Sequence, residues 1–182
     1  MYEDLLEKKL KSENIYDGVL LHVRRDTVTL PNGREAVREW VRHPGASAVL
    51  PVFEDGTVLL VRQYRYPVDR VTLEIPAGKL DSPKEDPLAC AVRELSEETG
   101  YTAKHWEKLT TIGTTIGFSN EYIHIYAAHD LQAGEQHTDD DEFIHVVKMP
   151  LEEAVERVKA GEIFDAKSVT AILMTALGKA KH

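Results

Sequence analysis

The stretch R-E-L-S-E-E-T-G-Y, residues 93–101, decides how this chain is interpreted, because it places three glutamates and an arginine within nine positions. It ends a segment with strong helix signals. Asp86 suits the N-cap, a proline follows at the first helical position, and Gly100 suits the C-terminal stop. The sequence therefore predicts a helix over residues 87–99. Its apolar residues recur at helical spacing and are expected to form the buried face: Leu88, Ala91, Val92 and Leu95.

The glutamates of this helix follow an i, i+3, i+4 spacing, which places Glu94, Glu97 and Glu98 side by side next to the apolar face. Like charges at this spacing repel each other, and the helix dipole disfavours negative charge near the C-terminal end. Helix stability gives no reason for the pattern. A solvated glutamate-rich face is one interpretation, and a set of hard oxygen ligands for Mg²⁺ or Mn²⁺ is the other.

Composition limits the class of protein. The chain has 182 residues, of which 42% are hydrophobic, so it can build a packed core. Its net charge of −9 argues against a nucleic-acid or acidic-membrane partner, which would require a basic face. One cysteine, Cys90, excludes an internal disulfide framework, and the sequence has no apolar run long enough to span a membrane. We therefore expect a soluble, cytoplasmic protein.

The order of predicted elements indicates a mixed α/β fold with a boundary at H-P-G, residues 43–45. We expect a β-element over 1–44 and a second domain over 45–182. Residues 1–14 alternate charge and leucine and are expected to form a short helix. Strands are expected in 19–43 on either side of the turn Pro31-Asn32-Gly33.

The second domain is expected to begin with a hairpin over 47–65, closed at Asp55-Gly56. Further elements follow from alternating β-rich and helical patterns. We expect strands at 72–76, 108–115, 122–128 and 143–149, and helices at 150–161 and 168–177.

The helix and the turn before it resemble the Nudix box, written G-x5-E-x7-R-E-U-x-E-E-x-G-U, in which U is aliphatic or aromatic. Gly78 opens the pattern, and from Glu85 onward the spacing fits through R-E-L-S-E-E-T-G-Y. Six residues rather than five separate Gly78 from Glu85, and the extra one falls in a D-S-P-K turn that can absorb it. On this pattern the chain is identified as a member of the Nudix family.

The resemblance implies an α/β Nudix fold, with a mixed β-sheet sandwiched between α-helices, and hydrolysis of nucleoside diphosphates linked to another group. It also implies a divalent cofactor, Mg²⁺ with Mn²⁺ as a substitute. Such metals neutralise phosphate oxygens and lower the pKa of the attacking water. By position, the metal ligands would be Glu94, Glu98 and the backbone carbonyl of Ala77, while Glu97 would ligate metal or polarise water.

The remaining residues of the box would have structural roles. Arg93 would orient the neighbouring glutamates through charge-assisted hydrogen bonds. Glu85 would pair with Arg93, and Gly78 and Gly100 would allow the turns at the two ends of the motif.

Beyond the box, the chain resembles the ADP-ribose pyrophosphatase branch of the family over nearly its whole length. The matching segments are L-P-N-G (30–33), V-R-H-P-G-A-S-A-V-L-P-V (41–52), V-R-Q-Y-R-Y-P-V (61–68), L-E-I-P-A-G-K-L-D (73–81) and D-A-K-S (165–168). The N-terminal strands resemble the small domain through which these enzymes form intertwined homodimers. Arg65 would then contact phosphate or ribose, and Glu74 would lie near the substrate. Glu39 or Trp40 would reach the partner's adenine pocket, with dimer core as the alternative for Trp40.

The segment after the box departs from the branch, because Ile116 stands where a proline is usual. An acidic loop, H-T-D-D-D-E-F (137–143), follows between two predicted strands. In the resembling enzymes the corresponding loop supplies a catalytic carboxylate, and the candidates are Glu142 and Asp141, then Asp139.

The resulting expectation is a Mg²⁺-dependent hydrolase that cleaves ADP-ribose to AMP and ribose 5-phosphate. The departure at Ile116 keeps a second substrate class open, another nucleoside diphosphate sugar or a dinucleotide. A third interpretation is a ligand sensor with a Nudix fold and no catalysis. Such sensors often lose box glutamates or add a DNA-binding segment, and neither feature occurs in this sequence.

Overall fold

The computed structural model describes residues 2–82, 84–138 and 142–179, which form two compact units. One unit comprises Met1–Gly45 and Gly113–Glu121, and the other comprises Ala46–Ile112 and Tyr122–His182. No helix of the described residues is long and apolar enough to cross a membrane.

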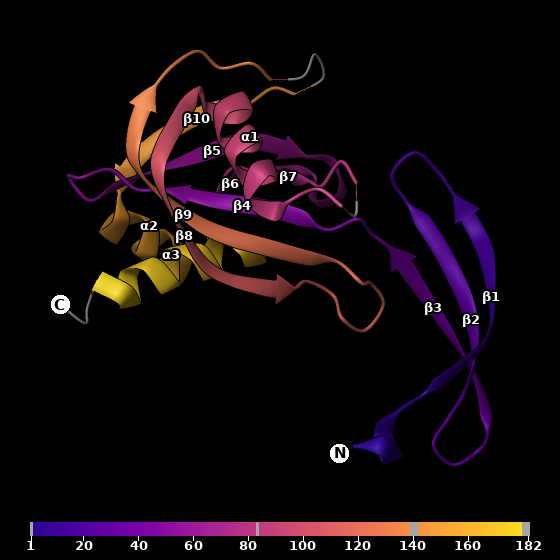
Figure 1. The fold of residues 1–182 in the computed structure, drawn as a ribbon. Coiled ribbons are helices and arrows are strands. Elements are labelled where there is room, and N and C mark those ends of the chain that lie inside the picture. The colour runs from indigo at the N-terminus through magenta and orange to yellow at the C-terminus, as the bar shows by residue number, and fades with distance from the viewer. Residues whose placement is uncertain (1, 83, 139–141, 180–182) are drawn as a thin grey trace. The chain divides into compact units, whose positions relative to one another are not determined.

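The first unit contains a three-stranded antiparallel sheet in the order β1-β2-β3, formed by Lys8–Asp17, His22–Thr29 and Glu35–Arg42 (Figure 1). The predicted turn joins β2 to β3. Gly33 has φ 81°, a left-handed conformation that favours glycine, and the Asn32 side chain accepts a hydrogen bond from the Arg34 N–H. The three strands bury only Asp26 and Val28, so this sheet has almost no core of its own.

The prediction of a short helix within residues 1–14 was wrong. Within residues 2–14, which the structure describes, only the single 3-10 turn η1 (Glu3–Leu5) is helical, and the chain enters β1 at Lys8. The pairing of β1 with β2 runs over the whole strand and overrides the local helical preference of a charged, leucine-containing segment.

Among its described residues, the second unit contains two sheets and three α-helices (Figure 1). One sheet has the order β7-β4-β9-β8 and the other β10-β5-β6. The strands are β4 (Ala46–Pro51), β5 (Thr57–Arg65), β6 (Arg70–Glu74), β7 (Ala77–Lys79), β8 (Tyr101–Gly113), β9 (Tyr122–Ala133) and β10 (His145–Pro150), with η2 (Tyr66–Val68) between β5 and β6. The helices are α1 (Pro87–Thr99), α2 (Leu151–Lys159) and α3 (Ala166–Lys179).

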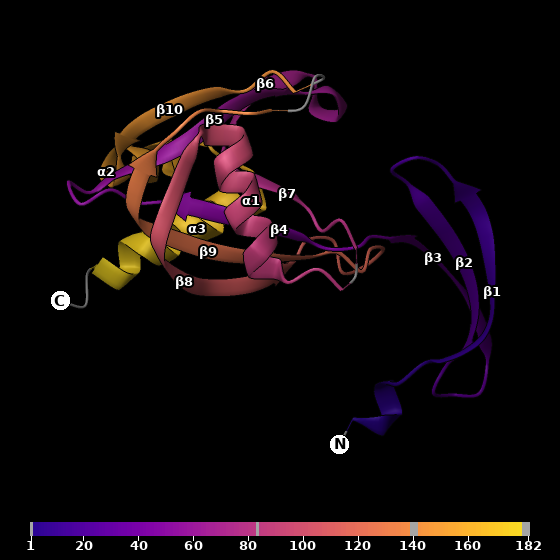
Figure 2. The same ribbon diagram turned by 45° about the horizontal axis from the view of Figure 1, so that its top comes forward.

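Strand β4 is the centre of the mixed sheet, because it pairs parallel with β9 and antiparallel with β7. All six of its residues are buried. Val49 packs with Leu95 of α1, whereas Leu50 belongs to the same core cluster as Ile172 of α3. The sheet therefore lies between α1 on one face and α3 on the other, as Figure 2 shows, which confirms the predicted fold class.

The predicted hairpin over 47–65 was wrong in its pairing. The turn at Asp55-Gly56 exists, but β4 and β5 belong to different sheets, and an isolated bridge joins Val52, just after β4, to Val58 of β5. Strand β4 finds its partners in β7 and β9 instead, and even Val52 N–H donates to Ala128 O. Sequence pattern identifies strands but not which neighbours they choose.

Helix α1 has the predicted ends. The Asp86 side chain accepts from Leu88 N–H at 3.3 Å, and Gly100 caps the other end with φ 73°. The predicted apolar face needs two corrections: Val92 is 43% exposed and Leu88 is only partly buried, whereas Cys90 is fully buried. Glu94 and Glu98 lie on this buried face, which brings two carboxylates into the interior.

Candidate active site

The site begins with a strand, a loop and a helix that bring Gly78 of β7 against Glu94 of α1. A Cβ atom added to Gly78 would overlap the Glu94 carboxylate. Glycine at this position therefore lets the helix approach the strand with an acidic side chain between them. Glu98, one turn later, accepts a hydrogen bond at Oε2 from the Ala77 N–H at 3.1 Å.

Glu94 and Glu98 are buried carboxylates with insufficient positive charge around them. Burial is the main cause that raises the pKa of Glu94 to about 7; Arg93 offsets it only in part, and repulsion from Glu97 and Glu142 adds to the rise. Burial and the neighbouring Glu94 raise the pKa of Glu98 to about 8. The local field therefore favours an added cation or proton.

Arg93 is the cation that links Glu94 and Glu97 on this helix. Its Nη1 donates to Glu94 Oε1 at 2.6 Å and to Glu97 Oε2 at 3.1 Å, and its Nη2 donates to the Lys79 carbonyl at 3.3 Å. These carboxylates raise the pKa of Arg93 despite its partial burial. Glu85 lies 3.6 Å from Arg93 Nη2 and accepts from the Asp81 N–H, so it ties the turn before α1 to the same arginine.

The segment that follows β9 is fixed to the C-terminal end of α1. Gly134 N–H donates to Gly100 O, His137 N–H donates to Glu97 O, and the Gln136 side chain donates to Glu98 O at 2.6 Å. A side chain at Gly100 would meet the backbone of Gln136 at 2.8 Å. Carbonyl groups that a helix end leaves unpaired thus anchor the start of the acidic loop.

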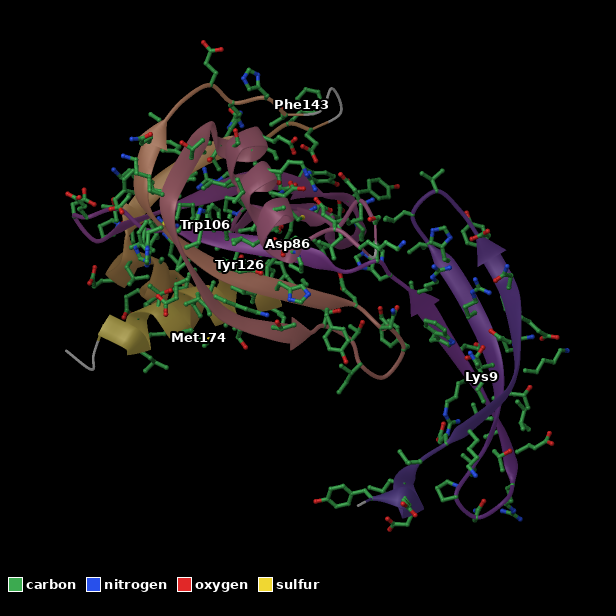
Figure 3. All side chains as sticks on the ribbon, in the orientation of Figure 1. Lys9, Asp86, Trp106, Tyr126, Phe143 and Met174 are labelled. Atoms are coloured by element: carbon green, nitrogen blue, oxygen red, sulfur yellow. The ribbon has the colours of Figure 1, made fainter. Side chains whose placement is uncertain are left out.

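Glu142 is the loop acid that the structure describes, and its charge raises the pKa of both Glu94 and Glu98. The next residue, Phe143, is 84% exposed on the segment leading into β10 (Figure 3). Asp139 and Asp141, the other candidates for the catalytic acid, lie outside the described residues.

A second polar cluster surrounds Glu74 at the end of β6. Arg65 forms two parallel hydrogen bonds with this carboxylate, Nε to Oε1 at 2.9 Å and Nη2 to Oε2 at 2.8 Å. Lys167 of α3 donates to Oε2, and Thr72 donates to Oε1 at 2.6 Å. Burial would raise the pKa of Glu74, but Arg65 and Lys167 outweigh it and bring that pKa to about 2.

The two clusters adjoin each other through Arg65, whose charge lowers the pKa of Glu98. The Arg65 side chain is 43% exposed, whereas Glu74 is 3% exposed. Arg65 is therefore the part of the Glu74 cluster that a ligand beside the acidic helix can reach.

Glu39 and Trp40 belong to the first unit, on β3. Glu39 pairs with Arg25 of β2 at 2.7 Å on an exposed surface. Trp40 is partly buried and donates from Nε1 to Asp26 Oδ2 at 3.0 Å. Ile116 is 83% exposed in the segment Gly113–Glu121 of the same unit.

The carboxylate oxygens of α1 and the backbone carbonyl oxygens of β7 are the kind of ligand that a hard divalent cation prefers. Among residues 2–82, 84–138 and 142–179, no three histidine, cysteine, aspartate or glutamate side chains already form a cage that could hold a metal. Mg²⁺ does not require such a cage, since it usually keeps several waters and binds one or two carboxylates together with substrate phosphates. The buried, mutually repelling Glu94 and Glu98 match that requirement.

Sequence reasoning missed two residues that organise this site. Lys167 stood in a quoted segment, D-A-K-S, without a role, and the structure brings it to Glu74 across 93 positions. Gln136 carried no signal, because a glutamine before an acidic loop is ordinary surface composition. The D-A-K-S match was the one available hint for Lys167.

Comparisons with known proteins agree with this geometry. A NUDIX domain model matches residues 41–171, and a nucleoside diphosphate sugar hydrolase N-terminal domain model matches residues 7–41. The chain is 42% identical over 180 residues to an ADP-ribose pyrophosphatase of Bacillus subtilis, covering 98% of this chain and 97% of that protein. It is also 42% identical over 179 residues to a methanol dehydrogenase activator of Bacillus methanolicus, covering 97% and 96%.

A solved structure, described as an ADP compounds hydrolase, has the same fold. It superposes with a TM-score of 0.85 at 24% identity and covers 97% of this chain and 96% of its own. With a domain model matching most of the chain and full-length relatives above 40% identity, this protein is a member of the Nudix hydrolase family.

Proposed function

We propose that this protein hydrolyses the pyrophosphate bond of ADP-ribose, giving AMP and ribose 5-phosphate, with Mg²⁺ as cofactor and Mn²⁺ as a substitute. The observation that carries the proposal is the pair of buried carboxylates, Glu94 and Glu98, whose raised pKa values mark a place for added positive charge. Full-length similarity to an ADP-ribose pyrophosphatase supports the choice of substrate.

The metal would be held by Glu94, Glu98 and the Ala77 carbonyl, with Glu97 as a further ligand or as a group that polarises water. When bound, the metal neutralises phosphate oxygens and lowers the pKa of water. Arg93 keeps Glu94 and Glu97 oriented through the two hydrogen bonds described above.

The chain's own residues would carry the proton transfer. Glu142, or Asp141 beside it in sequence, accepts a proton from the water that attacks one phosphorus atom. The new P–O bond forms as the bridging P–O bond breaks, and the two halves leave as phosphate monoesters. The effect of Glu142 on the pKa of Glu94 and Glu98 supports its nearness to the reacting group.

Substrate binding would use Arg65 for a phosphate or ribose oxygen, with Glu74 close to the substrate. The proposed assembly is a cytoplasmic homodimer in which Glu39 or Trp40 of one subunit reaches the adenine pocket of the other. All ten residues of β1 are exposed in the single chain, among them Leu10, Ile15 and Tyr16, and a second copy would cover such a surface.

A second substrate class has support of its own. The domain model that matches residues 7–41 is named for nucleoside diphosphate sugar hydrolases in general, not for ADP-ribose. In addition, Ile116 replaces the proline that is usual in the ADP-ribose branch. Another nucleoside diphosphate sugar or a dinucleotide would use the same metal chemistry. A non-catalytic sensor is the third candidate, although Glu94, Glu97 and Glu98 are all retained.

The deciding experiment incubates pure protein and Mg²⁺ with ADP-ribose, ADP-glucose, GDP-mannose and NADH, and measures the nucleoside monophosphate released. Fastest turnover of ADP-ribose supports the proposal, and faster turnover of another substrate supports the second class. Binding without turnover would support the sensor. Glu152→Gln, an exposed glutamate of α2, serves as a control for loss of a surface charge.

A further inference from the structure

The Glu74 carboxylate uses four hydrogen-bond donors, two on each oxygen. Oε1 accepts from Thr72 Oγ1 and Arg65 Nε, and Oε2 accepts from Arg65 Nη2 and Lys167 Nζ. Two parallel bonds between a guanidinium and a carboxylate hold the two planar groups in a common orientation. Whatever fixes the Glu74 carboxylate therefore also fixes Arg65.

Lys167 is the most buried cation of this cluster, with a side chain only 11% exposed. A buried ammonium is costly unless it is paired, and Lys167 donates to both Glu74 and Asp165 Oδ2, the latter at 2.9 Å. Asp165 Oδ2 also accepts from Ser168 N–H at 3.2 Å, at the start of α3. Helix α3 thus sets the position of Lys167, and Lys167 sets that of Glu74.

Asp165 is a potential competitor for Arg65. Its Oδ1 is buried and, among the described residues, has no hydrogen-bond partner. Its charge already acts on Arg65, where it contributes to raising the pKa. Without Lys167, Asp165 would lose its counter-charge, and Arg65 is a cation within range of its field.

We propose that Lys167 is a positioning residue: it holds Glu74 and neutralises Asp165, so that Arg65 stays aimed at the substrate. The inference rests on the proposed function, in which Arg65 contacts a phosphate or ribose of the substrate. Lys167 itself does not bind the substrate, because its hydrogen bonds are made inside the protein.

The test uses Lys167→Met, which keeps the length of the side chain and removes its charge, and Lys167→Arg, which keeps the charge. Lys159→Met is the matched control, since Lys159 forms an exposed pair with Glu156 on α2. Two readouts are taken: the Arg65 Nε–Hε resonance in ¹⁵N–¹H spectra, assigned by its loss in Arg65→Lys, and the KM and kcat for ADP-ribose.

We expect Lys167→Met to shift or abolish the Arg65 resonance and to raise KM about tenfold, the size expected for loss of one hydrogen bond to a charged group, with a smaller change in kcat. Lys167→Arg should largely restore both, and Lys159→Met should change neither. In an Arg65→Lys background, Lys167→Met should add less than about twofold, because the two residues act through one contact.

A rescue variant keeps the inference testable if Lys167→Met folds poorly. Asp165→Asn combined with Lys167→Met removes the competing charge and the uncompensated buried carboxylate while keeping an oxygen that can cap α3. We expect this double variant to recover the Arg65 resonance and to bring KM within about threefold of the wild-type value.

An unchanged Arg65 resonance in Lys167→Met would overturn the inference. So would an increase in KM from Lys167→Met that is as large in the Arg65→Lys background as in the wild type. The experiment also distinguishes failure of this inference from failure of the proposed function. If wild-type protein does not turn over ADP-ribose, the spectra alone still decide whether Lys167 positions Arg65.

Discussion

Two buried glutamate sites of this protein lie close together and have opposite electrostatics. Glu74 is surrounded by Arg65, Lys167 and Thr72, and its pKa falls to about 2. Glu98 is buried to the same degree, 3% exposed, yet its burial, with repulsion from Glu94, raises its pKa to about 8. The fold surrounds the first carboxylate with cations, whereas burial and repulsion dominate at the second. A buried carboxylate is therefore informative only together with the charges that face it.

Among the substitutions, the largest change in the free energy of unfolding is expected when the Glu74 cluster loses its carboxylate. Glu74→Ala leaves two cations, Arg65 and Lys167, without their shared carboxylate, and breaking a buried ion pair costs about 3–5 kcal/mol. Denaturant unfolding, with the slope checked for two-state behaviour, measures this change. The control is Glu153→Ala, which breaks an exposed pair with Arg157 and should cost less than about 1 kcal/mol. Equal costs for the two variants would remove the contrast between the sites.

Substitution of Glu98 should have the opposite effect on stability. At pH 8 and above, where Glu98 is charged, Glu98→Gln removes a repelling charge, so the metal-free protein should be at least as stable as the wild type. Its kcat should fall by about a hundredfold or more, because a group that holds the metal is lost. Thermal unfolding and steady-state kinetics measure the two effects. Activity near the wild-type level would show that Glu98 is not a metal ligand.

The pH dependence of stability should separate the two sites. A raised pKa in the folded state means that Glu94 and Glu98 contribute stability below pH about 4.5, which is lost as pH rises through 7 to 8. Glu74, with its lowered pKa, contributes stability above that pH, which is lost as pH falls toward 2. We expect metal-free protein to lose on the order of 5 kcal/mol between pH 5.5 and 8, about 2 from Glu94 and about 3 from Glu98.

Added Mn²⁺ should reverse most of that alkaline loss, since the metal takes the place of the protons. Unfolding free energies at pH 5.5 and 8, with Mn²⁺ and with a chelator, measure the difference. A Mn²⁺ effect that is the same at both pH values would contradict the account of Glu94 and Glu98.

The smallest effect is expected from a substitution at Gly78, where β7 lies against α1. Gly78→Ala places a methyl group where the Glu94 carboxylate lies, so that side chain must move. We expect Mn²⁺ affinity to fall about tenfold, as for loss of a group that orients a ligand. Gly161→Ala is a suitable control: it is a surface glycine, also outside the helices, with open space around its Cβ position. It carries its own strain from φ 74°, so stability as well as affinity must be measured. Equal Mn²⁺ affinity for Gly78→Ala and the wild type would mean that Glu94 can ligate from another position.

Sequence predicted those features that depend on neighbours along the chain. The ends of α1 at Asp86 and Gly100 follow from local capping, and the turns at Gly33 and Gly56 follow from the preference of glycine for positive φ. The acidic face of α1 was also visible, because helical spacing alone brings its glutamates together.

Features that depend on distant partners were not predictable in this way. The separation of β4 from β5 into two sheets depends on β9, which lies more than 70 positions after β4. The helix wrongly predicted over residues 1–14, much of which forms β1, likewise reflects pairing with β2. Lys167 became visible only when α3 packed beside β6 and brought it to Glu74.

The most direct test of the central claim is a Mn²⁺ titration followed by electron paramagnetic resonance, at pH 8, with and without AMP. We predict saturable binding by the wild type, and affinity lowered about tenfold or more in both Glu94→Gln and Glu98→Gln. Glu152→Gln should bind as the wild type does. Absence of binding in the wild type even with nucleotide, or equal binding by all four proteins, would contradict the claim that Glu94 and Glu98 form a cation site.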